Sequence, residues 1–530
     1  MTDGSTVTGG AAVVDALSAH DVTDVFGIPG THNLEIYRYL PEARIRHVVT
    51  RHEQGAGYAA DGYARVSGRP GVIVTTSGPG ITNAITALAT AYADSVPLLA
   101  ISPGPVRGTA GADIGWLHEM KDQHAALQAV CGRSVRVDTA DEIPDAVASV
   151  FAGFASRRPR PAHLEVPVDV LEGPWERRAV VTKPPPPPSR PTPEDAAAVA
   201  AALTRARRPL LIAGGGARGA AAHLRTLADL GIPIMTTVNG KGLVDESHPA
   251  ALGASMRLPA AHELINDADV LVVVGSELGD SDLWGGEVAP GSSRRTVVRV
   301  DLDPAQLHKN VRADVGVLGD AQLLLAAVVE RLGAAGLGTR EIDPSARKAV
   351  GTGADQDAGP WAEIQRVLAA TVPADTVVAG DSSQVTYYGT VHYWPFTPDN
   401  RLLYPTGYAT LGYGLPAAIG AKVADPSRPV IALVGDGAAM FSIQELMTAV
   451  EQRLTIPVVV VDNGGYAEIR QQMVERGITP QAVDLAQPDF AALARSIGAR
   501  GVVADHVADL GRLTAEALNA EGPTLIHHSV

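Results

Sequence analysis

Short apolar runs that end in glycine-containing turns recur along the chain, and each predicts a buried strand of a parallel sheet. The clearest are residues 430–434, which stop at Gly435-Asp436-Gly437, and residues 458–461, which stop at Asp462-Asn463-Gly464-Gly465. Apolar positions recur between them at the spacing of a helix: Ile443, Leu446, Met447, Val450 and Leu454. This strand–helix–strand order predicts a right-handed crossover, so both turns should lie at the carboxyl edge of one sheet, where open α/β sheets bind ligands.

The start of that helix carries its own signal. Ser442 and Glu445 form an S-x-x-E pattern, which predicts a capping box and a helix that begins near Ser442. The positive end of such a helix, together with glycines that let the backbone approach closely, suits a phosphate group.

The same strand–glycine pattern fills two earlier blocks. Apolar runs at 47–50 and 71–76 belong to the first block, and the second has runs at 210–213, 270–274 and 297–301. Five consecutive prolines between Lys183 and Arg190 predict a stiff linker, and residues 333–360, rich in Gly, Ala and Asp, predict a second linker with some helix. The prediction is an α/β protein of three doubly wound parallel-sheet domains, at 1–183, 190–335 and 358–530.

Composition narrows the class of protein. With 46% hydrophobic and 19% charged residues the chain is typical of globular proteins, and its apolar runs are too short to span a membrane. The net charge of −15 argues against a general nucleic-acid binder, and the single cysteine, Cys131, excludes an internal disulfide framework. Because the first ten residues show no signal-peptide pattern, we expect a cytoplasmic protein.

Asp436 and Asn463 follow neighbouring strands and are 27 positions apart (463 − 436 = 27). The predicted topology can bring their side-chain oxygens together beside the Gly465 carbonyl. These are hard oxygen ligands suited to Mg²⁺ or Ca²⁺, and such an ion commonly bridges a protein to a diphosphate. The two turns therefore predict a metal–diphosphate site.

This segment resembles the thiamine diphosphate signature of acetolactate synthases and 2-oxo acid decarboxylases, GDG followed some 27 residues later by NN. It departs once, at Asp462, which replaces the first Asn, whereas the ligand position is retained as Asn463. RHEQGAGYAADGYAR, from Arg51, closely resembles the family's activating-glutamate motif and implies that Glu53 activates the cofactor. The resemblance implies thiamine diphosphate, Mg²⁺ held by Asp436, Asn463 and Gly465, and a homodimer or homotetramer with active sites between a pyrimidine-binding first domain and a diphosphate-binding last domain.

Further cofactor contacts follow from the resemblance. Ser382 and Ser383 stand where the family has Gln and His in a diphosphate-binding loop, and their hydroxyls can still donate to phosphate. The Ala409 carbonyl would meet the exocyclic amine, and Leu411 would wedge under the cofactor, although plain core packing also explains a leucine. The remaining expected contacts are Thr76, Gly435, Gly437, Ala438 and Tyr466.

Two residues bear on the substrate. His118, in a Trp-Leu-His-Glu loop, replaces the family's Gln and could protonate the carbanion left after CO₂ loss, or it could be structural. Glu468 stands where acetolactate synthases usually carry Met; it could bind a cationic substrate tail, pass protons, or simply begin a helix. Glu119 could serve as a structural or a substrate-charge partner.

The predicted function is non-oxidative decarboxylation of a 2-oxo acid to an aldehyde and CO₂, with 5-guanidino-2-oxopentanoate as a candidate substrate. An acetolactate synthase-type carboligase and a non-catalytic relative that binds the cofactor remain alternatives. The middle domain holds FAD in acetolactate synthases, but GGGARG from Gly214 is not a full dinucleotide fingerprint, so a required FAD is not favoured.

Overall fold

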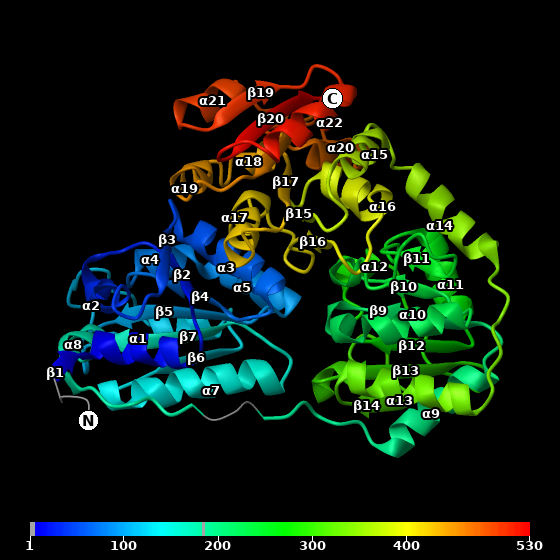
Figure 1. The fold of residues 1–530 in the computed structure, drawn as a ribbon, viewed down its shortest axis with the longest axis horizontal. Helices are drawn as coiled ribbons and strands as arrows, with labels where there is room; N and C mark the ends of the chain where they lie inside the picture. Colours follow the sequence, from blue (N-terminus) through cyan, green and yellow to red (C-terminus); the bar gives the residue numbers. More distant parts are fainter. Residues whose placement is uncertain (1–5, 183–185) are drawn as a thin grey trace.

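The computed structural model describes residues 6–182 and 186–530, and within these ranges it contains three six-stranded parallel sheets and a two-stranded ribbon (Figure 1). The strands are short, and the central ones are apolar and buried on both faces, as in β12 (Val270–Val274), whose sequence is VLVVV. Helices cover the faces of each sheet. The α/β class and the three doubly wound domains are confirmed, while the predicted domain limits at 183, 190, 335 and 358 stay a prediction.

The N-terminal sheet has the strand order β3-β2-β4-β5-β7-β6 and forms the blue and cyan lobe of Figure 1. Its strands are β2 (Asp24–Gly27), β3 (Arg46–Val49), β4 (Gly71–Val74), β5 (Leu98–Gly104), β6 (Arg133–Arg136) and β7 (Ala162–Pro167). Its helices are α1 (Gly9–Ala19), α2 (Leu34–Tyr39), α3 (Glu53–Ser67), α4 (Pro79–Asn83), α5 (Ile85–Asp94), α6 (Gln123–Gln128), α7 (Ile143–Ser156) and α8 (Val168–Glu172). The ribbon pairs β1 (Thr6–Thr8) with β8 (Pro174–Glu176).

The middle sheet, green in Figure 1, has the order β11-β10-β9-β12-β13-β14. Its other strands are β9 (Pro209–Ala213), β10 (Ile234–Thr236), β11 (Ala251–Gly253), β13 (Thr296–Asp301) and β14 (Val315–Leu318). Its helices are α9 (Pro193–Arg205), α10 (Ala221–Asp229), α11 (Pro259–Asp267), α12 (Asp280–Leu283), α13 (Ala321–Ala334) and α14 (Pro344–Asp355). The predicted second linker therefore contains a three-turn helix, α14.

The C-terminal sheet, yellow to red in Figure 1, has the order β16-β15-β17-β18-β20-β19. Its strands are β15 (Val377–Gly380), β16 (Arg401–Leu403), β17 (Val430–Gly435), β18 (Pro457–Asp462), β19 (Arg500–Val503) and β20 (Thr524–Ser529). Its helices are α15 (Trp361–Thr371), the π-helix η6 (Val385–Thr390), α16 (Val391–Tyr393), α17 (Gly414–Ala424), α18 (Asp436–Ala439), α19 (Glu445–Glu451), α20 (Ala467–Glu475), α21 (Phe490–Ser496) and α22 (Val507–Ala517).

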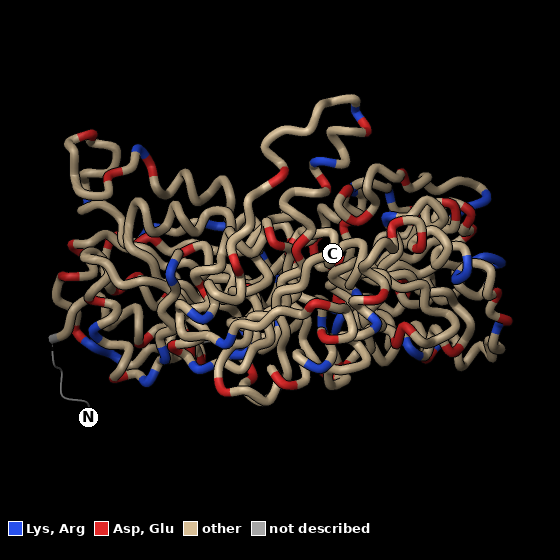
Figure 2. The backbone as a smooth tube through the Cα atoms, turned by 90° about the horizontal axis from the view of Figure 1, so that it is seen from above, with Lys and Arg blue, Asp and Glu red and all other residues tan. Residues whose placement is uncertain are grey.

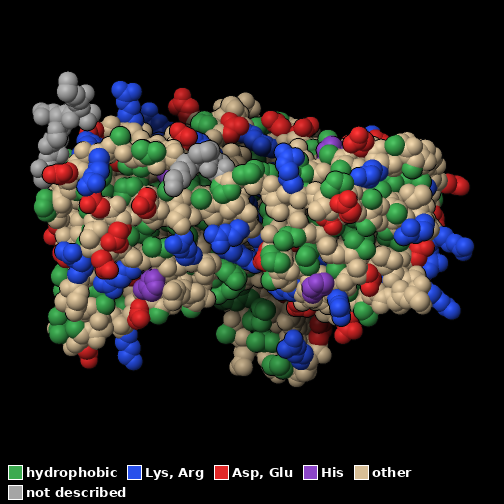
Figure 3. All heavy atoms as spheres, turned by 90° about the horizontal axis from the view of Figure 1, so that it is seen from below, with side chains coloured by type: hydrophobic (Ala, Val, Ile, Leu, Met, Phe, Trp, Pro, Cys, Tyr) green, Lys and Arg blue, Asp and Glu red, His purple; other side chains and the backbone are tan. Residues whose placement is uncertain are grey.

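Lys and Arg are interspersed with Asp and Glu over the face that Figure 2 presents. The opposite face, in Figure 3, has a hollow between the N-terminal lobe and the middle lobe. None of the helices within the described ranges is both long and apolar enough to cross a membrane.

The predicted capping box is wrong. Helix α19 begins at Glu445 and has no side-chain cap, because the Glu445 carboxylate leaves its own helix and accepts hydrogen bonds from the backbone N–H groups of Arg51 (3.0 Å) and His52 (2.9 Å). Thr448 Oγ1 donates a third bond to it at 2.8 Å. The carboxylate therefore fixes the turn that leads into α3, and the helix nearest the Gly435 turn is the short α18.

Helices α3 and α17 join the N-terminal and C-terminal sheets through one continuous apolar core. Their backbones approach so closely that a Cβ atom added at Gly420 would overlap the Ala59 carbonyl oxygen, and one added at Gly62 would overlap the Ala417 carbonyl oxygen. Glycine is needed here for the close approach of the two helices rather than for its backbone freedom.

We expect Gly420→Ala to lower the apparent Tm by several degrees. Alanine ordinarily stabilises a helix interior by about 1 kcal/mol relative to glycine, but overpacking against backbone costs about 1–3 kcal/mol or more. Gly351→Ala in α14 is the matched control, because nothing lies within 4 Å of its added Cβ. Thermal unfolding of both variants decides the matter, and an unchanged or raised Tm for Gly420→Ala would contradict the packing described.

Candidate active site

A cavity of about 480 Å³ lies at the carboxyl edge of the C-terminal sheet. The strands β15, β17 and β18 are neighbours in the sheet, so the loops that follow them meet at this edge. The cavity wall includes most of the predicted cofactor contacts: Ser382, Ser383, Ala409, Leu411, Gly435, Asp436, Gly437, Ala438, Asn463, Gly465 and Tyr466. The topology predicted for the two glycine turns is thus present, and the residues are gathered as expected.

The candidate metal ligands lie side by side. Asp436 is 1% exposed, and its Oδ1 atom accepts a 3.4 Å hydrogen bond from the backbone N–H of Asn463. Gly464 (φ +86°) and Gly465 (φ +123°) adopt backbone conformations that favour glycine, and the Asn-Gly-Gly turn depends on them. Burial raises the pKa of Asp436, with a smaller contribution from Asp462, so the carboxylate gains from a bound cation.

The donor set fits Mg²⁺, because a carboxylate, a side-chain amide and a backbone carbonyl are all hard oxygen donors. No cluster of three or more His, Cys, Asp or Glu side chains suited to a metal occurs in residues 6–182 and 186–530, and the predicted set does not depend on one. Asp462 stays outside the set: its carboxylate bonds His527 Nε2 (3.0 Å) and accepts from the Gly464 N–H (2.9 Å). The departure from the Asn-Asn pair is therefore accommodated within the fold.

Hydrogen bonds join the loop that contains Ser382 and Ser383 to the Gly435 turn. Ser383 Oγ accepts a hydrogen bond from the Gly435 N–H (3.2 Å) and donates to the carboxylate of Asp381. Burial raises the pKa of Asp381 to about 7. The Ser383 hydroxyl thus already has protein partners, and its clear role is to hold the loop against β17.

Glu468 faces the same cavity from the first turn of α20. Its carboxylate accepts hydrogen bonds from Gln384 Nε2 (3.1 Å), the Tyr388 hydroxyl (3.1 Å) and Gln472 Nε2 (3.0 Å). All three donors are neutral, and Glu468 makes no ion pair with any described residue. Tyr388 belongs to the π-helix η6, and π-helical turns occur frequently at functional sites. The arrangement holds a negative charge at the cavity wall without neutralising it.

Aromatic side chains border Glu468. Trp284, from the middle domain, lines the cavity, and its ring is within 6° of parallel to that of Tyr388. The Arg257 guanidinium lies 4.7 Å from the Tyr388 ring centroid, but it is committed to Asp357 (3.2 Å) and His392 (2.7 Å). The middle domain therefore completes one wall of the cavity.

Glu53 occupies the carboxyl edge of the N-terminal sheet, at the start of α3, and is 7% exposed. Asn83 Nδ2 donates to its Oε2 atom at 2.9 Å. The turn after β4, which contains Thr76, passes directly beside it, since a Cβ added at Gly80 would lie 3.3 Å from Glu53 Oε1. The Glu445 carboxylate also accepts hydrogen bonds from the backbone just before Glu53. Together these contacts hold the Glu53 carboxylate in one orientation.

His118 lies in the loop after β5 with a left-handed backbone, φ +66°, which is uncommon for a non-glycine residue. Its Nδ1 atom is 3.3 Å from Ser77 Oγ. Glu119 instead serves the loop: its carboxylate accepts hydrogen bonds from the backbone N–H groups of Ile114, Gly115 and Trp116, which lower its pKa. The structure therefore gives Glu119 the structural role among the two that the sequence left open.

Sequence reasoning missed His32, whose Nδ1 atom is 2.7 Å from the same Ser77 hydroxyl. The sequence signal for His32 was its position directly after the Gly30 turn that follows β2. This strand lies between β3, which precedes Glu53, and β4, which precedes Ser77. Gln487 was also missed; its Nε2 atom donates to Asp436 Oδ2 at 2.6 Å from a loop that carries no recognisable motif.

One chain does not bring all the predicted residues together. Glu53 and His118, both described, line no part of the cavity that contains Asp436. The N-terminal edge and the C-terminal edge of a single chain thus form two separate half-sites, one with Glu53 and His118 and one with Asp436 and Asn463.

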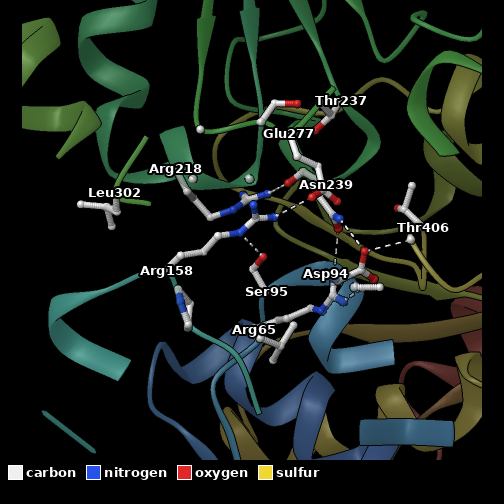
Figure 4. Close-up of a pocket in the computed structure, with 18 of the residues that line it drawn as sticks. Arg65, Asp94, Ser95, Arg158, Arg218, Thr237, Asn239, Glu277, Leu302 and Thr406 are labelled. Carbon is white, nitrogen blue, oxygen red and sulfur yellow. Dashed lines mark hydrogen bonds and ion pairs between the residues drawn. The ribbon is translucent and has the colours of Figure 1, made fainter. Parts of the chain in front are cut away.

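A second cavity, of about 390 Å³, lies where the three domains meet (Figure 4). Asp94, in the wall of this cavity, joins the three domains: it bonds Arg65 (2.9 Å), Asn239 Nδ2 (3.0 Å) of the middle domain and the Gly407 N–H (3.0 Å) of the C-terminal domain. The glycine turn after β9 packs on the turn after β12, since a Cβ at Gly214 would overlap the Gly275 carbonyl oxygen. Close packing, together with the left-handed backbone of Gly275 (φ +61°), accounts for these two glycines. The expectation that FAD is not required stays a prediction.

Comparison with known proteins identifies the family. Three models of thiamine pyrophosphate enzymes match in succession: the N-terminal TPP binding domain at residues 7–126, the central domain at 196–328 and the C-terminal TPP binding domain at 381–528. The chain belongs to the thiamine pyrophosphate enzyme family.

Relatives that match over most of both chains support the same family. A probable 2-ketoarginine decarboxylase of Pseudomonas aeruginosa is 41% identical, over 98% of this chain and 94% of that protein. The acetolactate synthase large subunit of Parasynechococcus marenigrum is 36% identical, over 98% and 87%. A probable acetolactate synthase large subunit of Methanococcus aeolicus is 30% identical, over 98% and 92%. The chain is therefore a thiamine pyrophosphate-dependent enzyme, as the motifs predicted.

Proposed function

We propose that the protein decarboxylates a 2-oxo acid with a basic side chain, such as 5-guanidino-2-oxopentanoate, to the aldehyde one carbon shorter and CO₂. The observation that carries the proposal is Glu468, a carboxylate at the wall of the cavity with three neutral donors and no ion pair among the described residues. A guanidinium or ammonium tail would supply the missing charge. The similarity to a probable 2-ketoarginine decarboxylase supports the same substrate class.

The chain's residues divide the work between the two half-sites. Asp436, Asn463 and the Gly465 carbonyl would hold Mg²⁺, and the glycine turn with Ser382, Ala409, Leu411 and Tyr466 would hold the cofactor. Bound thiamine pyrophosphate supplies a sink for the electron pair left when CO₂ departs. Glu53, fixed by Asn83, would bond the cofactor's pyrimidine ring, and His118 would deliver a proton to the carbon that has lost CO₂. One proton from solvent is consumed for each aldehyde formed.

The complete site would require a second copy of the chain. Because Glu53 and Asp436 lie in separate half-sites of one chain, we propose that the N-terminal edge of one copy closes the C-terminal cavity of another, in a homodimer or a dimer of dimers. Exposed apolar side chains at these edges support this: Leu34, Ile114, Leu117, Met440 and Phe441 are 47–65% exposed. Such a cover would bring His118 to the cavity that Glu468 faces.

A carboligase that forms acetolactate or a related hydroxyketone is the second candidate, favoured by the acetolactate synthase relatives. Both reactions pass through CO₂ loss and differ in whether the next partner is a proton or a second carbonyl. The retained Glu53, Asp436 and Asn463 argue against a non-catalytic relative.

Product analysis separates the candidates. The purified protein, with Mg²⁺ and thiamine pyrophosphate, is incubated with pyruvate and with branched, aromatic and guanidino 2-oxo acids, and products are identified by mass. We expect an aldehyde one carbon shorter, formed fastest from the guanidino acid. A condensed product as the main outcome would show a carboligase, and a preference for neutral acids would defeat the assignment of Glu468.

Glu468→Gln should reduce the preference for basic over neutral 2-oxo acids more than it reduces the rate of decarboxylation. Loss of the charge should raise KM for the guanidino acid by about tenfold or more, the effect of one charge-assisted hydrogen bond, and leave KM for a neutral 2-oxo acid nearly unchanged. Glu363→Gln, an exposed glutamate on α15, is the control for a general change in surface charge. An equal loss with both classes of substrate would show that Glu468 transfers protons instead.

A further inference from the structure

Two histidines from different loops meet on one serine hydroxyl at the N-terminal edge. His32, after β2, has its Nδ1 atom 2.7 Å from Ser77 Oγ, and His118, after β5, has its Nδ1 atom 3.3 Å from the same oxygen. The two imidazole centroids are 5.1 Å apart. The order β3-β2-β4-β5 brings these loops together beside the loop of Glu53.

Packing contacts hold the cluster of His32, Ser77 and His118 in place. The His32 ring stacks on the Trp116 ring with centroids 4.6 Å apart and planes within 10°. Ser77 is 1% exposed, and a Cβ at Gly78 would crowd the Cβ of His118, so the turn after β4 fits directly under the histidine. The left-handed backbone of His118 is held in place by these contacts together with the Glu119 carboxylate on the preceding N–H groups.

The single hydrogen of the Ser77 hydroxyl limits which of the three groups can donate a hydrogen bond. A serine hydroxyl carries one hydrogen, so it can donate to only one of the two Nδ1 atoms, and the other ring must donate its Nδ1–H to the oxygen. When Ser77 donates to one of the rings, the three groups form a directional chain in which His32 Nδ1–H donates to Ser77 Oγ while Ser77 Oγ–H donates to His118 Nδ1, or the reverse. In the first arrangement His118 carries its proton on Nε2, the atom that Ser77 does not bind.

We propose that His32 is a positioning residue that sets the tautomer of His118 and resupplies its proton through Ser77. The inference rests on the proposed function. As His118 Nε2 gives its proton to the carbon that has lost CO₂, His118 Nδ1 takes the Ser77 hydroxyl proton, Ser77 takes the His32 Nδ1 proton, and His32 Nε2 takes one from solvent. One solvent proton enters for each proton delivered, so His118 stays neutral as it gives up its Nε2 proton. The chain then stands in the reverse arrangement, and it returns to the first when His118 Nε2 takes a solvent proton and His32 Nε2 releases one, with no other reactant.

The surroundings suit a neutral relay. Burial lowers the pKa of His32, and the neighbouring His118 lowers it further, so His32 conducts a proton near pH 7 rather than holding a charge. Charged groups approach the cluster from several elements: Glu53 on α3, Glu119, Lys121 and Asp122 in the loop, and Arg136 and Glu165 on the strands beneath. Glu53 and Glu119 are occupied by Asn83 and by backbone N–H groups, and Arg136 pairs with Glu165 at 3.2 Å.

His32→Phe tests the relay, because phenylalanine keeps the stack on Trp116 and removes both ring nitrogens. We expect kcat for aldehyde formation to fall by about tenfold or more with little change in KM, and the proportion of condensed product to rise, because the unprotonated carbon survives longer. Ser77→Ala should give the same loss, and the double variant no further loss. His20→Phe is the matched control. His20 also stacks on an aromatic ring, that of Phe151 with centroids 4.6 Å apart, but it lies away from the site.

Histidine NMR of the protein without substrate or cofactor supplies a readout independent of turnover. The titration midpoint of His118 should shift in His32→Phe and in Ser77→Ala and stay unchanged in His20→Phe. An unchanged His118 titration together with wild-type rate and product ratio in His32→Phe would overturn the relay alone. Absence of aldehyde from every 2-oxo acid with the wild-type enzyme would overturn the proposed function, and the relay with it.

Discussion

Glu53→Gln is expected to bind the cofactor normally and to lose most turnover, by about 100-fold to 10,000-fold, the range typical of a lost general acid–base group. Glutamine keeps the volume of the buried side chain, and Asn83 can still bond it by turning its own amide. What it removes is the carboxyl group that would exchange a proton with the pyrimidine ring. This one variant should therefore retain cofactor binding while it loses turnover.

Cofactor binding by fluorescence quenching or calorimetry, paired with CO₂ release, measures the two effects. Glu42→Gln is the control, because Glu42 is an exposed glutamate of the same domain that pairs with Arg177 at the surface. Turnover of Glu53→Gln close to that of the wild type would refute the role of Glu53, whereas loss of cofactor binding would show that it serves mainly as a structural contact.

Asp436→Asn should abolish measurable activity by weakening Mg²⁺ binding more than about 100-fold, since one of its protein ligands loses its charge. The fold should survive: asparagine is nearly isosteric, and the buried charge of Asp436 costs free energy in the metal-free protein, as its raised pKa shows. We expect the Tm without metal to be equal to or above that of the wild type, and the rise in Tm with added Mg²⁺ and cofactor to disappear.

Asp462→Asn is the matched control for that variant. It replaces the adjacent carboxylate, which bonds His527 and lies outside the expected ligand set, and it restores the Asn-Asn pair that the family usually carries. Mg²⁺-dependent activity should persist. Loss of activity in Asp462→Asn with retention in Asp436→Asn would reverse the assignment of the metal ligands.

The parts of the site that the sequence predicted are those encoded locally. A buried strand that ends in glycines places the next residues at a sheet edge, so the positions of Asp436 and Asn463 could be predicted from the residues around them, and Glu53 was predicted from the motif that resembles the family's. The spacing of Asp436 and Asn463 follows from one crossover unit, and β17 and β18 are indeed parallel neighbours.

The parts that could not be predicted depend on contacts between distant segments. Ser442 and Glu445 satisfy the capping-box pattern, yet Glu445 bonds backbone 394 positions away, because the meeting of α3 and α19 offers it two unpaired N–H groups. His32, Ser77 and His118 meet only because β2, β4 and β5 are neighbours in the N-terminal sheet, an order that strand patterns do not determine. Tyr388, one of the three partners of Glu468, lies in a π-helix that periodicity does not reveal.

We propose that one reaction centre is assembled from two half-sites on different copies of the chain. Co-expression of Glu53→Gln and Asp436→Asn chains, each inactive alone, tests it by aldehyde formation from the guanidino acid. If the half-sites come from different copies, about a quarter of the centres carry both intact residues, and about a quarter of wild-type activity should return. If Glu53 and Asp436 of the same chain formed the centre, every centre would contain a substitution and the mixed protein would stay inactive.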